Sequence, residues 1–181
     1  MKVPLVDKKM TLISALAGPA LVLICAAQLH AAAAPAKQVD VAAVVTKADA
    51  EAALGEPVKE PQPRNGDGTD GYYSRCNYYS ERPGKSLVLR VHQSTAGKLD
   101  AKKHFEMLSG GNGKIESISG LGDRAGYIKG NGQAGGPDEK VMMVYVAKGN
   151  ALVTIGIAGL DDEMMALNKA KEIAKKILTQ L

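Results

Sequence analysis

Residues 141–158, VMMVYVAKGNALVTIGIA, decide the fold of this chain. Two apolar runs, at 141–147 and 152–158, have the length of buried strands and are rich in the β-branched residues that favour strands. The segment Lys148-Gly149-Asn150 between them is short enough for a β-hairpin. The first run is apolar at nearly every position, which predicts a central strand covered on both faces. The pair therefore predicts an antiparallel sheet.

Further strands are predicted upstream of this hairpin. Residues 72–79, YYSRCNYY, and residues 87–92, LVLRVH, alternate in part between apolar and polar side chains. The turn residues 81–84, ERPG, join them. Short extended segments at 115–118 and 125–129 complete a sheet of about five to six strands.

Helical signals lie before, within and after these strands. Thr46 is the N-cap of a first helix, with Asp49 in a near-capping-box position and Gly55 at its end. A second helix spans about 98–108. The last helix begins at Asp161 as its N-cap, with acidic residues in its first turn and lysines further along. Apolar residues recur along it at helical spacing: Leu167, Ala170, Ala174, Ile177 and Leu181.

The predicted fold class is α+β. An antiparallel sheet of about five to six strands packs with two to three helices in the order α-β-β-α-β-β-β-β-α. Residues 59–71 and 130–138, which are rich in Gly, Asn and Pro, are predicted as loops.

The first 36 residues have the three parts of a secretory signal peptide. A basic start at residues 1–9 precedes an uncharged apolar run at 12–27 and a small-residue cleavage zone at 31–36. The apolar run is shorter than the roughly 20 residues of a membrane-spanning helix. We therefore expect a secreted or periplasmic protein that starts near Ala34 or Lys37.

The domain boundaries follow from this leader. Residues 1–36 are predicted as the signal peptide, 37–43 as a flexible entry and 44–181 as a single α+β domain. Two alternatives leave the protein on a membrane through its leader, which stays either uncleaved or lipidated at Cys25. A lipoprotein signal has a small residue before its Cys, whereas Ile24 stands here.

Charge and cysteine content limit which partners and which disulfide bonds we expect. The leader carries +2 of the formal net charge of +4, so the rest of the chain is nearly neutral and nucleic acid is not predicted as a partner. Removal of the leader with Cys25 leaves Cys76 without an intramolecular partner. Cys76 shares a strand face with Ser74 and Tyr78, and we expect a buried thiol; a bond between chains is the alternative.

No motif in the sequence has the surrounding elements or the spacing that its known chemistry requires. Residues 130–135, GNGQAG, match G-x-G-x-x-G, but a strand rather than a helix is predicted to follow, so no cofactor is predicted. His92, His104 and Cys76 are the candidate metal ligands, and no two of them have a ligand spacing, so no metal site is predicted. The chain has no G-x-S-x-G elbow, and no catalytic residue is predicted.

One strand offers a candidate binding surface. Tyr73, Arg75, Asn77 and Tyr79 share the face opposite to Cys76. On a solvent-exposed face they would form an aromatic and polar patch suited to a partner, a glycan or a peptidoglycan strand. The alternative is that these side chains serve cross-strand packing under a helix or loop.

Three segments resemble those of small exported bacterial domains of unknown function, many of them lipoproteins and most familiar from actinobacteria. They are residues 45–55, VTKADAEAALG, residues 76–78, CNY, and residues 120–125, GLGDRA. The resemblance covers roughly residues 42–181. It implies an α+β fold similar to that of PsbP-like domains, and it carries over no catalytic residue.

The sequence thus predicts an exported, non-enzymatic binding or structural domain of the bacterial cell envelope. Its expected partner is an envelope protein, a lipid or a glycan. The alternative is an envelope hydrolase or another enzyme whose site is assembled from distant residues.

Overall fold

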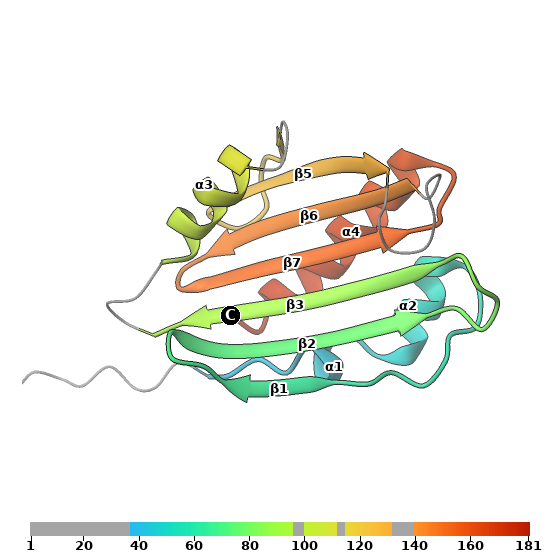
Figure 1. Ribbon diagram of the computed structural model, residues 1–181, viewed down its shortest axis with the longest axis horizontal. Helices are drawn as coiled ribbons and strands as arrows, with labels where there is room; N and C mark the ends of the chain where they lie inside the picture. The colour runs from blue at the N-terminus through green and yellow to red at the C-terminus, as the bar shows by residue number, and fades with distance from the viewer. Residues whose placement is uncertain (1–36, 96–99, 112–114, 132–139) are drawn as a thin grey trace, which may run out of the picture. The chain divides into compact units, whose positions relative to one another are not determined.

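A seven-stranded antiparallel sheet forms the fold, in the strand order β1-β2-β3-β7-β6-β5-β4 (Figure 1). The structure is a computed structural model, which describes residues 37–95, 100–111, 115–131 and 140–181. The strands are β1 (Arg64–Asp67), β2 (Gly71–Tyr79), β3 (Ser86–Ser94), β4 (Glu116–Ser117), β5 (Arg124–Asn131), β6 (Lys140–Lys148) and β7 (Ala151–Ala158). The helices are α1 (Val41–Val44), α2 (Lys47–Leu54), α3 (Ala101–Gly111) and α4 (Glu163–Leu178).

The predicted hairpin lies in the middle of the sheet. β6 and β7 pair in register from Val141 opposite Ala158 to Lys148 opposite Ala151. β6 also pairs with β5, and β7 with β3, so both strands are interior as predicted. The α+β class with an antiparallel sheet is confirmed, and the sheet gains its seventh strand from β1.

The sheet has one fully covered face. Side chains alternate along each strand, so Val153, Ile155 and Ile157 of β7 point to one face while Leu152 and Thr154 point to the other. The first set packs under α4, which passes behind the strands in Figure 1. α1 and α2 cover the same face beside β2 and β3, and together these elements bury the main hydrophobic core.

The other face is covered at one end only. Phe105 of α3 packs there with Ala147 and Leu152 in a second, smaller cluster. Farther along β6, the outward side chains Tyr145 and Met143 are half-buried, and Tyr145 packs against this cluster. The prediction that β6 is covered on both faces therefore holds for the helix-packed face and for the end under α3.

Local capping follows the sequence closely at α2. The Thr46 side chain accepts a hydrogen bond from the Asp49 amide at 3.3 Å, and the Thr46 amide donates to Asp49 at 2.7 Å. Gly55 ends the helix with a φ of 74°, which is unstrained for a residue without Cβ. The N-cap of α4 is Asp162 rather than Asp161, because its carboxylate is the one that accepts from the amide of Met165, at 3.0 Å.

Two segments predicted as irregular are ordered. Residues 37–43 were expected to be a flexible entry, but Val39 and Val41 are buried and α1 begins within this range. The Val39 amide donates to the Gln93 side chain at 2.7 Å, and the Val41 amide donates to the Ser74 hydroxyl at 2.9 Å. These long-range bonds hold the segment, and local sequence signals do not encode them.

The second such segment is the predicted loop at 59–71. Its residues Arg64–Asp67 form the edge strand β1, which pairs with β2. All four residues are exposed, so no apolar alternation marks the strand. Pairing with β2 overrides the turn preference of Asn65, Gly66 and Asp67.

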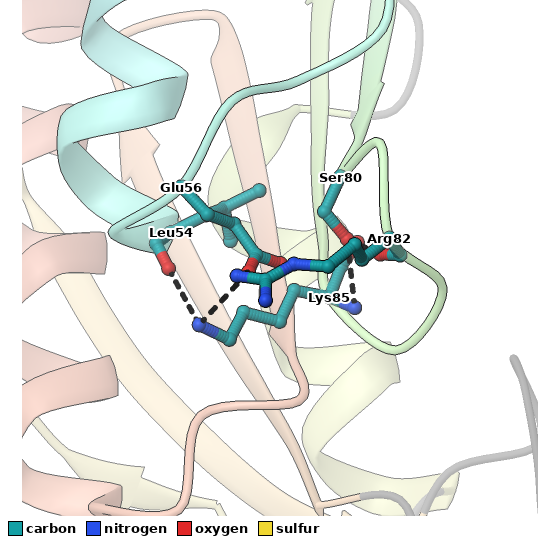
Figure 2. A network of polar contacts seen from close by, with 5 residues as sticks. All are labelled: Leu54, Glu56, Ser80, Arg82 and Lys85. Atoms are coloured by element: carbon teal, nitrogen blue, oxygen red, sulfur yellow. Dashed lines mark hydrogen bonds and ion pairs between the residues drawn. The ribbon is translucent and has the colours of Figure 1, made fainter.

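A polar network fixes the β2–β3 hairpin to the end of α2 (Figure 2). Lys85 Nζ donates to the Leu54 carbonyl at 3.0 Å and lies 3.7 Å from Glu56 Oε2, which also pairs with Arg82 at 3.1 Å. Burial raises the pKa of Glu56, but hydrogen bonding from Ser80 and the two cations outweigh it and lower the pKa. The network holds the helix end against the hairpin.

The residues of the GLGD segment form a tight bend before β5. Gly122 has a φ of 63°, and a Cβ there would meet the Ala147 carbonyl oxygen at 2.6 Å. The Asp123 amide donates to that carbonyl at 2.7 Å, and its carboxylate accepts from the Gly149 amide at 2.7 Å. The segment thus ties β5 to the β6–β7 turn, which is a structural role.

Other sequence predictions fall outside the described ranges. These are the signal peptide at 1–36 with Cys25, and most of the glycine-rich loop at 130–138. Within the described ranges, no helix has the length and apolar character needed to cross a bilayer.

Candidate functional site

The face of the sheet away from α1, α2 and α4, here called the open face, contains a groove of about 630 Å³. The open face is the one toward the viewer in Figure 1, where α3 borders it. Strands β1, β2, β3, β6 and β7 supply the groove's lining, together with α3. The side chains discussed below are Arg64, Tyr73, Arg75, Arg90, His92, His104, Leu108, Met143, Tyr145, Leu152 and Thr154.

Three arginines lie side by side across three neighbouring strands in this groove. Arg64 of β1 is directly opposite Arg75 of β2, and Arg75 is directly opposite Arg90 of β3. Like charges at directly opposed positions repel one another. No guanidinium group of the three has a hydrogen bond or ion pair to another described residue. We call this row the arginine row.

An aromatic cluster lies beside the arginine row, one step closer to α3. The rings of Tyr73 and His92 stack with centroids 4.2 Å apart and planes 9° apart. His104 of α3 meets His92 edge-on at 5.8 Å. The Tyr73 hydroxyl donates to both carboxylate oxygens of Asp70 at 2.8 Å. The cluster fixes the orientation of the two rings that line the groove.

Burial sets the protonation of this cluster. It lowers the pKa of His92 below its ordinary value, and the Asp70 carboxylate raises it only in part. Burial and the hydrogen bond to Asp70 together raise the pKa of Tyr73, while that bond lowers the pKa of Asp70. The lowered pKa favours the neutral ring, and its Nε2 lies 3.7 Å from Asp70 Oδ2, a contact that is an ion pair only when the ring is protonated.

Two imidazole nitrogens of the groove lack partners. His92 Nε2 and His104 Nδ1 are buried atoms with no hydrogen-bond partner among the described residues. Buried polar atoms are nearly always hydrogen-bonded, to protein or to a bound molecule. His92 is 7% exposed, and its Nε2 lies 3.7 Å from Asp70 Oδ2, just beyond hydrogen-bond distance.

An apolar wall completes the groove. Leu108 of α3 and Met143 of β6 are half-buried, and Leu152 of β7 is buried in the cluster under α3 against which Leu108 packs. Burial raises the pKa of Tyr145 at this end of the groove, although nearby Arg90 lowers it in part. The groove thus combines a cationic floor with an apolar wall.

The four predicted patch residues do share the open face, and the structure divides them between two hollows. Tyr73 and Arg75 line the groove. Asn77 and Tyr79, with Arg75 again, line a smaller hollow of about 270 Å³. Tyr73 is 42% exposed and Tyr79 51% exposed, and the Asn77 amide donates to the Tyr79 hydroxyl at 3.0 Å.

Sequence reasoning missed the other half of the groove. Arg90 interrupts an otherwise apolar strand, which was a usable signal, whereas Arg64 lay in a predicted loop. His92 and His104 were considered as separate candidates because 11 positions separate them in the sequence. Their proximity depends on how α3 packs over β3.

The other chemical candidates separate in space. Cys76 is a free thiol buried on the helix-packed face, as predicted, and burial raises its pKa. It therefore cannot act together with His92. Among the residues in the described ranges, no three His, Cys, Asp or Glu side chains are grouped so that they could hold a metal ion.

Comparisons with known proteins identify the fold. No family model matches the sequence, and no curated protein matches it. The structure is similar to the crystal structure of the extracellular domain of PknH from Mycobacterium tuberculosis, with a TM-score of 0.53 and 10% identity. The match covers 80% of this chain and 99% of that one. At this identity the likeness concerns the fold, and it confirms at that level the predicted resemblance to exported bacterial domains.

Proposed function

We propose that this chain is an exported, non-enzymatic binding domain whose ligand lies in the groove on the open face. The groove itself carries the proposal. Its volume of about 630 Å³ is in the range of small-molecule sites, and it combines apolar walls with a few converging polar groups. The envelope partners that suit it are a lipid, a glycan or a side chain of an envelope protein.

Export is supported by the predicted leader and by the likeness of the fold to an extracellular domain. The intact mass of the protein recovered from its producing cells tests it. A start near residues 34–37 supports a secreted or periplasmic protein. A diacylated start at Cys25 supports the lipid-anchored form, and recovery of the unprocessed chain from the cytoplasm would contradict export.

Binding in the groove is tested with a variant that fills it. Gly66 of β1 lies opposite Tyr73 and lines the groove, and a Cβ at this position meets no atom within 4 Å. Gly66→Trp therefore adds bulk to the groove without a backbone clash. Gly130→Trp is the matched control, because Gly130 has equally open space and does not line the groove.

The readout is saturable binding of polarity-sensitive naphthalene dyes by the full chain. We expect Gly66→Trp to remove most of the binding and Gly130→Trp to leave it unchanged. Equal binding by both variants and by the unsubstituted chain would place the dye elsewhere and contradict the proposal.

One observation favours the enzyme alternative, namely that His92 lies near Asp70 in a cleft. A hydrolase of that kind needs a nucleophile hydrogen-bonded to the imidazole. No described serine, threonine or cysteine side chain is hydrogen-bonded to His92, and its ring face is covered by Tyr73. A binding site needs no such nucleophile, so binding explains the position of His92 and Asp70 without a further residue.

A further inference from the structure

The arginine row sets the charge of the groove. Arg64 and Arg90 are exposed and Arg75 is half-buried, so a ligand in the groove can reach their guanidinium groups. Asp67 is the one carboxylate among the described lining residues, and its Oδ1 already accepts a hydrogen bond from Gln38 at 3.0 Å. The Asp70 carboxylate beside the groove is likewise held, by the Tyr73 hydroxyl, so neither carboxylate is shown paired with the three arginines.

Mutual repulsion makes such a row unfavourable in the empty groove. Opposed like charges destabilise a sheet, and a single anion between them removes that repulsion. Guanidinium groups bind carboxylate, phosphate and sulfate through paired N–H donors, so an anionic group is the ligand chemistry that fits the row. We therefore expect the three guanidinium groups to repel one another less when an anion is bound between them.

The remaining lining is mixed: apolar and aromatic side chains lie beside polar ones such as Thr154 and His104. Leu108, Met143 and Leu152 line the part of the groove formed by α3, β6 and β7, with Met143 and Leu152 in the rows on either side of the row that contains Arg90. The ring of Tyr73, stacked on His92, lines the part formed by β2 and β3. The groove volume of about 630 Å³ exceeds what an inorganic ion fills and is in the range of sites that hold a hydrocarbon or ring system. A ligand that filled the groove would contact both parts.

We infer that the groove binds an amphiphilic anion: an acidic head group on the arginine row, joined to an apolar body against Leu108, Met143 and Leu152. The inference deepens the proposed function and rests on it. The head group is defined by its charge and its oxygens, which a carboxylate, phosphate or sulfate group shares.

Two dyes that differ by one sulfonate test the head group. N-phenyl-1-naphthylamine is neutral, and 8-anilinonaphthalene-1-sulfonate has the same ring skeleton with an anionic group. Binding is measured on the full chain, and the part that Gly66→Trp removes is taken as binding in the groove. We expect the sulfonate to bind at least about tenfold more tightly at low salt, as for one charge-assisted contact.

Charge variants locate the effect. Arg75→Gln and Arg90→Gln are each expected to weaken sulfonate binding several-fold and to leave the neutral dye unchanged, whereas Arg75→Lys keeps part of the preference. Lys175→Gln is the control, because it removes one positive charge from an exposed site on α4, on the other side of the sheet.

Calorimetric titration of dodecyl phosphate and inorganic phosphate into the unsubstituted chain distinguishes an amphiphile from a free ion.

The outcomes separate the two proposals. Equal groove binding of both dyes would overturn the anionic head group and leave the groove as a binding site. Inorganic phosphate binding as tightly as dodecyl phosphate would overturn the apolar body. If neither dye nor dodecyl phosphate bound in the groove, the inference and the proposed function would both fall.

Discussion

The two faces of the sheet are built from alternate residues of the same strands, yet their chemistry is opposite. The face under α1, α2 and α4 carries residues such as Leu89, Val153 and Ile155, all buried in one apolar core. The open face carries Arg75, Arg90 and other polar side chains in the corresponding rows. The first face carries the main hydrophobic core. The second carries a smaller cluster under α3 and leaves the groove uncovered beside it.

The largest expected difference between the faces lies in two neighbouring residues of β7. Ile155→Ala should lower the free energy of unfolding by about 2–5 kcal/mol, because it leaves a cavity in the core. Thr154→Ala on the open face should change it by no more than about 0.5 kcal/mol. Denaturant unfolding of the two variants measures both, and similar costs would show that the open face also carries the core.

Two adjacent tyrosines of β2 sharpen the comparison through a hydrogen bond. The buried Tyr78 hydroxyl donates to the Val45 carbonyl, whereas the Tyr79 hydroxyl is exposed. Tyr78→Phe leaves that carbonyl unsatisfied and should cost about 1–3 kcal/mol. Tyr79→Phe removes only an exposed hydrogen bond from the Asn77 amide and should cost no more than about 0.5 kcal/mol. Amide hydrogen exchange of α1 and α2 provides a second readout, since α1 precedes Val45 directly; unchanged protection in Tyr78→Phe would contradict the role of this bond.

A substitution in the arginine row should raise the free energy of unfolding, whereas the preceding substitutions lower it. Arg75→Gln removes repulsion toward Arg64 and Arg90, so the unliganded protein should become more stable by about 0.2–1 kcal/mol. The gain should shrink as salt screens the charges. Thermal or denaturant unfolding at low and high ionic strength tests this, and a loss of stability at low salt would show that Arg75 has a stabilising partner.

The smallest expected effect is a pH dependence from His92. Burial lowers its pKa in the folded state, and the facing groups act against each other, since Asp70 raises that pKa and His104 lowers it. Below the ordinary value of 6.5 the unfolded chain binds a proton at this position more readily than the folded chain. Stability should therefore be complete above about pH 6.5 and decrease as the pH falls through the folded-state pKa.

His92→Phe keeps an aromatic ring on Tyr73 and removes the titration. Comparison of its stability with that of the unsubstituted chain between pH 7.5 and about pH 5 isolates the His92 contribution, above the range where Asp70 titrates. An identical slope in both proteins would show that His92 is not the group responsible.

Much of the covered face could be predicted from the sequence. The central hairpin, the capping box of α2 and the burial of Cys76 and Tyr78 all follow from periodicity and short-range signals. The start of α4 was placed one residue early, because Asp161 and Asp162 have the same side chain and only the geometry selects one. Segments held by distant partners were missed, as α1 and β1 show.

The open face could be predicted only in part. Alternation along one strand places Tyr73, Arg75, Asn77 and Tyr79 on a common face, and the structure agrees. Alternation along one strand cannot indicate that Arg75 lies between Arg64 and Arg90, because that arrangement depends on the register of three strands. The proximity of His92 to His104 likewise depends on where α3 packs.

The sequence by itself determined which side chains of each strand share a face, because the two-residue period of a strand is a local property of the chain. The tertiary structure decided which residues meet across strands and which face the helices leave uncovered. Both depend on contacts between residues far apart in the chain, where burial and register are settled together. The arginine row and the groove around it belong to this second class.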